Sequence, residues 1–329
     1  MPTTSVIYSA MPTELGSVVS YARLAEQTSG NRLWCGQTLT MESHHLFAAL
    51  STLGLDLSYG TAVSVMPMRH PLTAALNARS IAALSQRPFV AGIGPGAAVL
   101  QERLLGAPYR RPVHTTRSYA TMLRTLANNG TAEAPDGPWE TTGITLPTLG
   151  TPPVEVGIGV LRESMARLAG EVADWAITWL TPAPWIARHI APALREGHRR
   201  SADPSRPLPR IAAVVQCAVA RPGRDLVHIA RRAAGTHLSA PHYTDMLRQA
   251  GVPAHADDPD TGARLLVEHG VLAHGTPQEI ATQLAAYHAA GVDEVVVNVG
   301  GVHLAEGAGA ALGDLSAILD AVEEREQQR

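Results

Sequence analysis

Short runs of β-branched and other apolar residues alternate with longer helical patterns along the whole chain, and this alternation restricts the fold more than any other feature. Because a helical segment separates each run from the next, the strands must pair in parallel. Eight parallel strands close a barrel, so we expect an α/β fold of the (β/α)8 TIM barrel type with insertions. An open, doubly wound sheet is the alternative. The predicted strands are 6–8, 33–35, 56–66, 89–94, 154–158, 175–180, 211–220 and 294–299.

The chain of 329 residues is long enough for one barrel of about 250 residues with added segments. Residues 128–153 are rich in proline, glycine and threonine, which predicts an insertion that can contain a short hairpin. Residues 225–269 predict two or three extra helices. We therefore predict a single barrel domain over residues 1–329, with an insertion at approximately 128–153 and extra helices at approximately 225–269.

Composition excludes several kinds of chemistry. All 26 basic residues are arginine, so no lysine can form a Schiff base or bind a phosphate. The net charge of −3 gives no reason to expect nucleic acid or an anionic membrane as a partner. Nowhere do eighteen apolar residues follow one another, and the first eleven residues lack the basic segment of a signal peptide. We expect a cytoplasmic protein with two reduced core thiols, Cys35 and Cys217.

Metal and hydrolase motifs are missing from the sequence. His44 and His45 are adjacent, so on a helix they point about 100° apart, unlike the i, i+4 pair that shares a metal. No G-x-S-x-G motif for a nucleophilic serine is present. Gly92-Ile93-Gly94-Pro95-Gly96 lacks the spacing of a dinucleotide motif, and its proline removes a donor. We therefore expect no bound metal and no Rossmann-type cofactor site.

In a TIM barrel the active site lies at the carboxyl ends of the strands. Gly157-Ile158-Gly159 directly precedes the helical pattern from Arg162, which makes it a candidate phosphate loop or simply a tight turn. Trp179, at another strand end, is placed to stack on a planar ring or to pack in the core. Arg69 and His70 follow the third strand. Either residue is a candidate contact for a substrate or cofactor. The alternative is that Arg69 forms a structural ion pair and that His70 is a surface residue.

Five segments of the chain carry a more specific pattern, and they are 22–34, 60–71, 89–96, 168–174 and 275–297. In this order they resemble the bacterial luciferase-like family, whose members are barrel oxidoreductases that use a flavin or a deazaflavin. The segment 178–182, Thr-Trp-Leu-Thr-Pro, is most similar to the branch of that family that uses coenzyme F420.

The resemblance implies a deazaflavin at the carboxyl ends of the strands. Gly157, Ile158 and Gly159 would hold one end of it, and Gly94 to Gly96 would lie near its tail. Ala62 and Val63 would form a bulge with a cis peptide bond behind the ring, a bond that costs about 3–4 kcal/mol. Gln37 and Trp179 complete the predicted cofactor-binding residues, which are Gln37, Ala62, Val63, Gly94, Gly96, Gly157, Ile158, Gly159 and Trp179.

The sequence also departs from the sugar-phosphate dehydrogenases of that branch. They carry an Asp-His pair where this chain has Gln37-Thr38, and a carboxylate where it has Ala97. Their phosphate-binding lysines are absent. Oxidation of a phosphosugar is therefore disfavoured. The sequence is still compatible with a reductase, in which the substrate would receive its proton from His44, His70, Tyr8 or water.

We hypothesise hydride transfer from reduced coenzyme F420 to an unsaturated C=N, C=C or C=O group of a small or natural-product substrate. The first alternative is a monooxygenase of the same fold that uses reduced FMN. The second is a non-catalytic barrel that binds a flavin or serves as a partner subunit, since the usual acid and base are missing. The resemblance also implies a homodimer.

Overall fold

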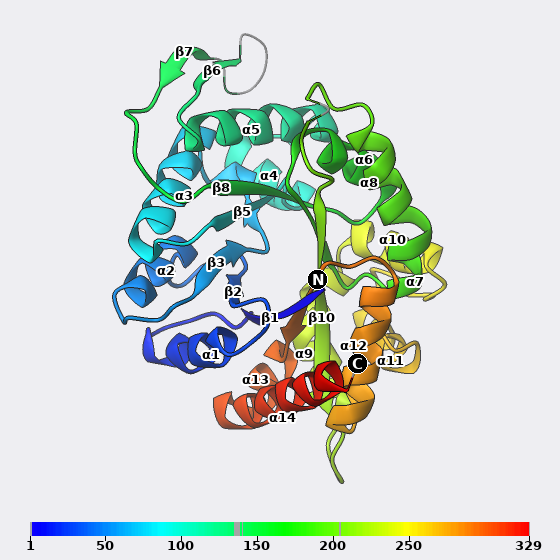
Figure 1. Cartoon of the computed structure of the whole chain (residues 1–329). Helices are drawn as coiled ribbons and strands as arrows, with labels where there is room; N and C mark the ends of the chain where they lie inside the picture. Colours follow the sequence, from blue (N-terminus) through cyan, green and yellow to red (C-terminus); the bar gives the residue numbers. More distant parts are fainter. Residues whose placement is uncertain (1, 135–138, 140, 204, 329) are drawn as a thin grey trace.

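The structure is a computed structural model that describes residues 2–134, 139, 141–203 and 205–328. The predicted (β/α)8 barrel is confirmed: eight parallel strands pair in the order β1-β2-β3-β5-β8-β9-β10-β12 and close on β1, with the helices outside (Figure 1). The barrel strands are β1 (Thr3–Tyr8), β2 (Arg32–Cys35), β3 (Ser58–Thr61), β5 (Phe89–Gly94), β8 (Val154–Gly159), β9 (Trp175–Trp179), β10 (Arg210–Val219) and β12 (Glu294–Asn298).

Helices form a ring around the strands, because each returns the chain from the carboxyl end of one strand to the start of the next. Two short non-α turns also occur, the 3-10 turn η1 (Met66–Met68) and the π-turn η2 (Ile186–Ile190). The α-helices are α1 (Gly16–Glu26), α2 (Ser43–Ser51), α3 (Pro71–Ser85), α4 (Ala98–Leu105), α5 (Pro112–Ala127), α6 (Glu163–Val172), α7 (Ala183–Trp185), α8 (Ala191–His198), α9 (Leu226–Leu238), α10 (Pro241–Gln249), α11 (Pro259–Glu268), α12 (Pro277–Ala289), α13 (Gly300–Glu306) and α14 (Ala308–Gln327).

Both faces of the barrel strands are buried, as parallel sheets require. One face packs against the helices and forms the larger apolar core. The opposite face fills the barrel interior with a smaller cluster, in which Trp34 and Trp175 meet edge to face at 6.0 Å. Side chains alternate between the two faces along each strand. Residues at the strand ends that continue the interior-facing series therefore point towards the barrel mouth.

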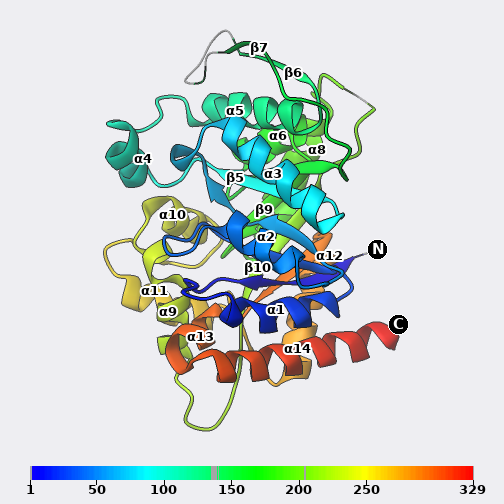
Figure 2. The same ribbon diagram turned by 90° about the vertical axis from the view of Figure 1, so that its left-hand side faces the viewer.

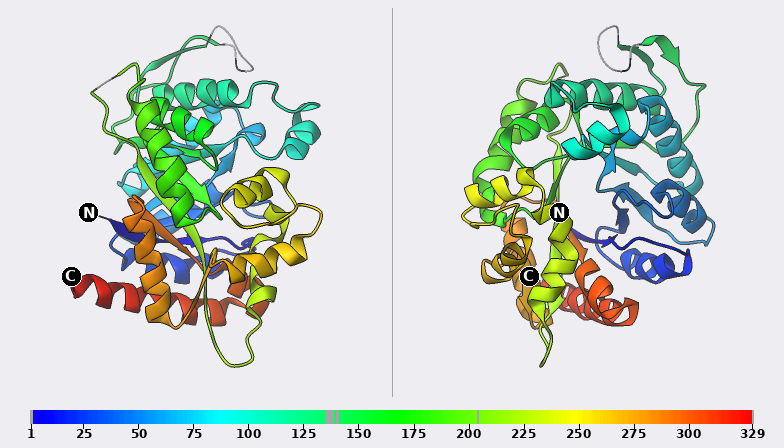
Figure 3. Two further views of the ribbon diagram at one scale, coloured as in Figure 1. Left: turned by 90° about the vertical axis from the view of Figure 1, so that its right-hand side faces the viewer. Right: turned by 180° about the vertical axis from the view of Figure 1, so that it is seen from behind.

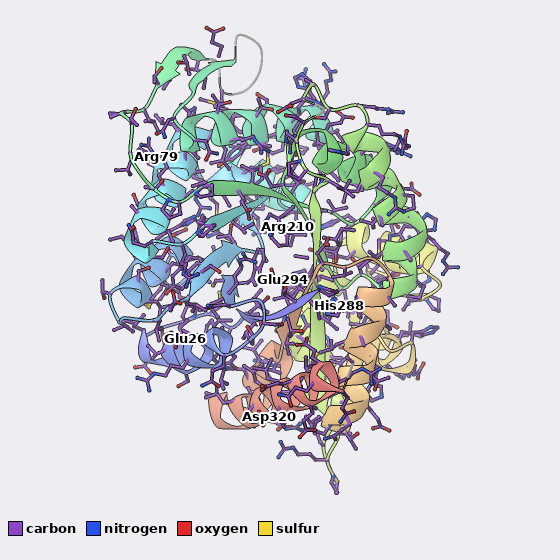
Figure 4. All side chains as sticks on the ribbon, in the orientation of Figure 1. Glu26, Arg79, Arg210, His288, Glu294 and Asp320 are labelled. Atoms are coloured by element: carbon purple, nitrogen blue, oxygen red, sulfur yellow. The ribbon has the colours of Figure 1, made fainter. Side chains whose placement is uncertain are left out.

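The amino end of the barrel is closed by charged and aromatic side chains. Arg32 pairs with Glu294, whose carboxylate also accepts a hydrogen bond of 2.7 Å from the Trp34 indole. Arg210 lies over the Trp175 ring at 3.9 Å. Arg210 and Glu294 appear at the centre of the barrel when it is viewed as in Figure 4. The amino end of the interior is thus filled by the barrel's own side chains.

Several elements differ from the sequence-based prediction. The predicted strand 56–66 is two strands, β3 and β4 (Ser64–Val65), separated by Ala62 and Val63. β11 (Leu272–Gly275), α4 and α13 were not predicted, because they are short and, in α13, begin with two glycines. A capping box begins α12, in which the Thr276 backbone N–H donates a hydrogen bond to the Glu279 carboxylate.

The two predicted added segments contain regular structure. Within residues 128–153 lies the antiparallel hairpin of β6 (Thr131–Ala134) and β7 (Thr141–Thr145). Residues 135–138 and 140 of this segment lie outside the described residues. Residues 225–269 contain α9, α10 and α11. Among the described residues, no helix combines the length and apolar character needed to cross a membrane.

Candidate active site

The side chains that end the barrel interior at its carboxyl end come from neighbouring strands. Trp179 pairs in register with Val214 on β10, and Gln216, two residues further along β10, pairs with Asn298 on β12. Ser9, just after β1, donates a hydrogen bond of 2.6 Å to the Asn298 side chain. On the opposite side Val63 lies close to Gly94 and Gly159. We call this set the mouth floor: Ser9, Val63, Gly94, Gly159, Trp179, Gln216 and Asn298.

Two buried donors of the mouth floor have no hydrogen-bond partner among the described residues. Asn298 is fully buried, and its side-chain oxygen accepts bonds from Ser9 and, at 2.8 Å, from the Gly300 backbone N–H. Its Nδ2 group has no partner, and neither has Nε1 of Trp179. Buried donors are rarely left unpaired, so this pair fits a ligand that offers acceptor atoms.

The glycines of the interior fall into two groups. A Cβ atom on Gly92 would lie 1.9 Å from the Thr61 carbonyl oxygen, and one on Gly157 would lie 2.7 Å from Ile177. These two glycines therefore make room for the barrel's own packing. A Cβ atom on Gly159 would meet nothing closer than 3.6 Å. A Cβ atom on Gly159 would thus make only ordinary contacts, so the packing of the barrel does not require a glycine there.

Gly157 to Gly159 form the end of β8 and not a loop at a helix N-terminus, since α6 begins four residues later at Glu163. The Ile158 side chain is fully buried in the core between strands and helices. Only the backbone of Ile158 is therefore placed near the mouth. Gly96, beyond β5, adopts a positive φ of 73° that glycine favours, and it leads into α4.

The predicted bulge after β3 is present, and the peptide bond between Ala62 and Val63 is cis. The end of β2 holds the bulge by two backbone hydrogen bonds. The Ala62 N–H donates to the Cys35 carbonyl at 3.0 Å, and the Gln37 N–H donates to the Val63 carbonyl at 3.1 Å. Gln37 is thereby held beside the bulge at the end of β2. The structure brings together five of the predicted cofactor-binding residues, namely Gln37, Ala62, Val63, Gly94 and Gly159.

A charged cluster connects the loops that follow β2 and β4. Glu42 caps α2, since its carboxylate accepts a hydrogen bond of 2.6 Å from the His44 N–H. The same carboxylate lies 3.0 Å from His44 Nδ1. Arg69 donates to Glu42 at 2.7 Å and to the Gln37 side chain at 3.0 Å. Burial raises the pKa of Glu42, but the bonds from His44 and the charge of Arg69 outweigh it and lower that pKa to about 2.

Removal of the Glu42 charge is expected to remove a pH-dependent part of the stability. A carboxyl group with a lowered pKa stabilises the fold above its ordinary value of 4.5, and this contribution is lost as the pH falls towards about 2. The free energies of unfolding of wild type and Glu42→Gln should therefore differ by a constant amount near neutral pH and converge in that acidic range. Denaturant unfolding over a pH series measures this. The control is Glu102→Gln, which removes an exposed carboxylate on α4. The difference between its free energy of unfolding and that of wild type should not shrink in the acidic range. A constant gap in Glu42→Gln would contradict the assignment.

The three predicted proton donors lie in different environments. His44 is buried and held by Glu42. His70 is exposed, and its Nδ1 accepts a bond of 3.1 Å from the Leu72 N–H as the cap of α3. Tyr8 points to the outer face of β1, where its hydroxyl lies 3.2 Å from Ser17 and its ring packs on Tyr21. The structure does not bring these three side chains together.

Trp179 meets residues of the extra helices. His237 on α9 lies 5.2 Å from the Trp179 ring, and Tyr243 on α10 packs against His237 at 4.9 Å. Burial lowers the pKa of His237 to about 4, so the imidazole is neutral near pH 7. Sequence reasoning missed His237, Gln216 and Asn298. The last two were detectable as polar residues inside apolar strand runs at interior-facing positions.

Surface hollows occur elsewhere. One of about 650 Å³ is lined by His274, Gly275 and the first turns of α12, and one of about 380 Å³ lies at the start of α5. Neither includes a mouth-floor residue, and neither contains unpaired buried donors, so we place the candidate site at the mouth. Within the described part of the chain, no three His, Cys, Asp or Glu side chains gather as a metal site would need.

The eight parallel strands define a TIM barrel. The polar groups and the bulge lie at the carboxyl ends of these strands, where TIM barrels have their active sites. The family model described as luciferase-like monooxygenase matches residues 2–294. The chain therefore belongs to the luciferase-like monooxygenase family, whose members are oxidoreductases. No curated protein sequence matches the chain significantly.

Solved structures with the same fold use two kinds of cofactor. An F420-dependent secondary alcohol dehydrogenase, in complex with an F420–acetone adduct, has a TM-score of 0.70 at 16% identity, over 97% of this chain and 99% of that one. A coenzyme F420-dependent tetrahydromethanopterin reductase from Methanopyrus kandleri has a TM-score of 0.64 at 16% identity, over 95% and 97%. The oxygenating constituent of 3,6-diketocamphane monooxygenase from Pseudomonas putida, in complex with FMN, has a TM-score of 0.67 at 14% identity, over 98% of both chains.

Proposed function

We propose that this protein is an oxidoreductase that uses reduced coenzyme F420 to reduce an unsaturated C=N, C=C or C=O group of a small-molecule substrate. The observation that carries the proposal is the pair of unpartnered buried donors, Asn298 Nδ2 and Trp179 Nε1, across the mouth floor from the Val63 bulge. A flavin or deazaflavin ring offers carbonyl and ring-nitrogen acceptors to such donors, and its flat face suits an apolar surface.

The residues of the mouth floor would bind and orient the cofactor ring. When bound, reduced F420 supplies a hydride. Val63, with the backbone of Gly94 and Gly159 beside it, would support one face of the ring. Trp179 and Asn298 would donate to acceptor atoms at its edge and so fix its rotation.

A proton must also reach the reduced substrate, and we propose that His44 donates it. Glu42 holds its Nδ1, and Arg69 joins the pair to Gln37 beside the bulge. The low pKa of Glu42 keeps this carboxylate charged at neutral pH, so it is available to accept a hydrogen bond from the His44 ring. His70 and Tyr8 are engaged in capping and packing away from the mouth floor.

Turnover tests the proposal. Under anaerobic conditions the protein should oxidise reduced F420 when given a suitable member of a panel of cyclic imines, enones and ketones. The recovery of the oxidised cofactor's absorbance measures the rate. Cofactor binding without turnover of any class would favour the non-catalytic alternative.

A monooxygenase that uses reduced FMN is the second candidate, because a solved structure of the same fold contains FMN. The mouth floor offers the same donors to either ring. Oxygen consumption with reduced FMN, together with no binding of F420, would replace the first candidate with the second.

A further inference from the structure

Arg69 has a buried hydrogen-bonding group that the fold does not use. Its side chain is only 8% exposed, and its Nη2 group donates to Glu42 at 2.7 Å and to Gln37 at 3.0 Å. Its other amino group, Nη1, is buried and has no hydrogen-bond partner among the described residues. An arginine amino group has two N–H donors and carries part of the positive charge, so it is costly to leave unpaired inside a protein. An acceptor from outside the fold would remove this cost.

A second unused donor lies in the next connection between strands. The Tyr109 hydroxyl, between α4 and α5, is buried and also has no hydrogen-bond partner among the described residues. Burial raises the pKa of Tyr109 to about 12, so near neutral pH the hydroxyl keeps its proton and can donate a hydrogen bond. The Gln101 amide donates to the Gly96 carbonyl at 2.9 Å and accepts 2.8 Å from the Tyr109 N–H. Tyr109 is thereby tied to the loop that follows β5.

Tyr119 on α5 brings the two donors into one region. Its hydroxyl donates to the Arg69 carbonyl oxygen at 3.1 Å. Burial raises the pKa of Tyr119, the positive charge of Arg69 lowers it, and Tyr109 raises it. Because electrostatic effects weaken with distance, the Arg69 guanidinium and the Tyr109 hydroxyl must both lie near the Tyr119 hydroxyl. The Trp139 ring packs against both tyrosine rings, at 5.0 Å from Tyr119 and 6.3 Å from Tyr109.

This region has a surface side and an inner side. Tyr109 and Trp139 are only half-buried, so the surface is close. Figures 2 and 3 show the β6–β7 hairpin lying over α5, with α4 at the end of the molecule away from both termini. On the inner side Arg69 bonds to Gln37, whose backbone N–H donates to the Val63 carbonyl in the bulge. Arg69 is thus connected to the mouth floor through a single side chain.

The kind of acceptor follows from the charges. Glu42 is the acidic partner of Arg69 among the described residues, and its carboxylate is already bound by Arg69 Nη2 and by His44. Other arginines in the described part of the chain, such as Arg79 and Arg206, leave only the single N–H of Nε unpaired. Two donors, one of them cationic, match the two oxygens of a carboxylate, and charge-assisted hydrogen bonds are about twice as strong as neutral ones.

We propose that Arg69 Nη1 and Tyr109 Oη form a subsite for a carboxylate group of the substrate, beside the mouth floor. The inference rests on the proposed oxidoreductase function, because it assigns an unsaturated carboxylate as the substrate class of that same site. Each carboxylate oxygen accepts from one of the two donors, and the unsaturated bond extends towards the bulge at Val63. In the reduction that bond takes up one hydride and one proton, and the carboxylate is unchanged.

Binding of a matched pair of small molecules tests the subsite. Crotonate and crotonamide have the same carbon skeleton, but only crotonate is negatively charged. Calorimetry gives the dissociation constants of both, with and without F420. Wild type should bind crotonate about tenfold more tightly than crotonamide, because hydrogen bonds between charged groups are stronger than neutral ones.

Two substitutions each remove one donor. Tyr109→Phe removes only the hydroxyl and should weaken crotonate binding about tenfold, with a smaller effect on crotonamide. Arg69→Lys keeps a positive charge beside Glu42 but lacks the second planar amino group, so it should lose most of the preference for crotonate. The matched control is Tyr287→Phe, which changes a buried tyrosine on α12 and should bind both molecules as wild type does.

The stability of the free protein separates a binding role from a structural one. Because the Tyr109 hydroxyl has no partner among the described residues, Tyr109→Phe should leave the melting temperature unchanged or raise it. A lower melting temperature together with unchanged crotonate binding would assign the hydroxyl to the fold and contradict the inference.

Three further results would overturn it. One is equal binding of crotonate and crotonamide by wild type. Another is unchanged crotonate binding in folded Tyr109→Phe and Arg69→Lys variants. The third is displacement of F420 by crotonate, which would assign the subsite to an acidic group of the cofactor.

Failure of the proposed function gives a different pattern. Preferential binding of crotonate, with no oxidation of reduced F420 by any substrate, would refute the proposed function and leave the carboxylate subsite. Turnover of neutral imines or ketones, with no preference for crotonate over crotonamide, would support the function and refute the subsite.

Discussion

Replacing Gly159 with leucine is expected to weaken F420 binding about 100-fold, which corresponds to about 3 kcal/mol. Gly159 ends the interior face of β8, and a Cβ atom there would make ordinary contacts of 3.6 and 3.7 Å with Ile93 and Val63. The fold should therefore accept the substitution, while the remaining leucine atoms would occupy the space in which we propose that the ring lies. Fluorescence titration with F420 measures the loss.

Two variants make this result specific. Gly159→Ala adds only the Cβ atom and should bind with a much smaller loss. Gly309→Leu, on α14, adds the same side chain where nothing lies within 4 Å of the new Cβ atom, and it should bind as wild type does. Unchanged binding in a folded Gly159→Leu variant would place the cofactor away from the mouth floor.

Replacing Asp314 with alanine is expected to destabilise the protein by about 3–5 kcal/mol, because it removes a buried carboxylate that pairs with two arginines and leaves Arg224 with Glu306 as its only acidic partner among the described residues. Asp314 is fully buried on α14 and accepts 2.6 Å bonds from both Arg221 and Arg224, and the Arg224 side chain is only 4% exposed. Its second oxygen also accepts 2.9 Å from the Val219 N–H at the end of β10. The loss therefore affects the end of a barrel strand as well as a charge.

Denaturant unfolding of Asp314→Ala measures the effect, with Asp56→Ala as the control. Asp56 also pairs with an arginine, Arg87, but its side chain is 68% exposed, so solvent screens the pair. The control should unfold at nearly the same denaturant concentration as wild type. Equal shifts in the two variants would show that burial does not determine the strength of these pairs.

The barrel was predictable because its strands are apolar on both faces and therefore stand out as runs between helical patterns. Asn298 and Gln216 interrupt such runs, so their interior position follows from counting alternate residues. The split of the third strand into β3 and β4 also matches the resemblance at Ala62 and Val63.

Contacts between distant loops were not predictable. The pairing of Arg69 with Glu42 and Gln37 depends on where two loops from different strands meet. Gly157 and Gly159 look alike in the sequence, and only the position of Ile177 separates a packing role from a place at the mouth. Helix α4 was also not predictable, because it has no regular apolar face towards the core. The side-chain amide of Gln101 holds it to the preceding loop instead.

The central claim is that a deazaflavin binds at the mouth floor, and parallel fluorescence titrations with F420 and FMN test it most directly. We predict saturable binding of F420 to wild type, much weaker binding of FMN, and loss of F420 binding in Gly159→Leu. Tight binding of FMN with none of F420, or F420 binding that Gly159→Leu leaves unchanged, would contradict the account.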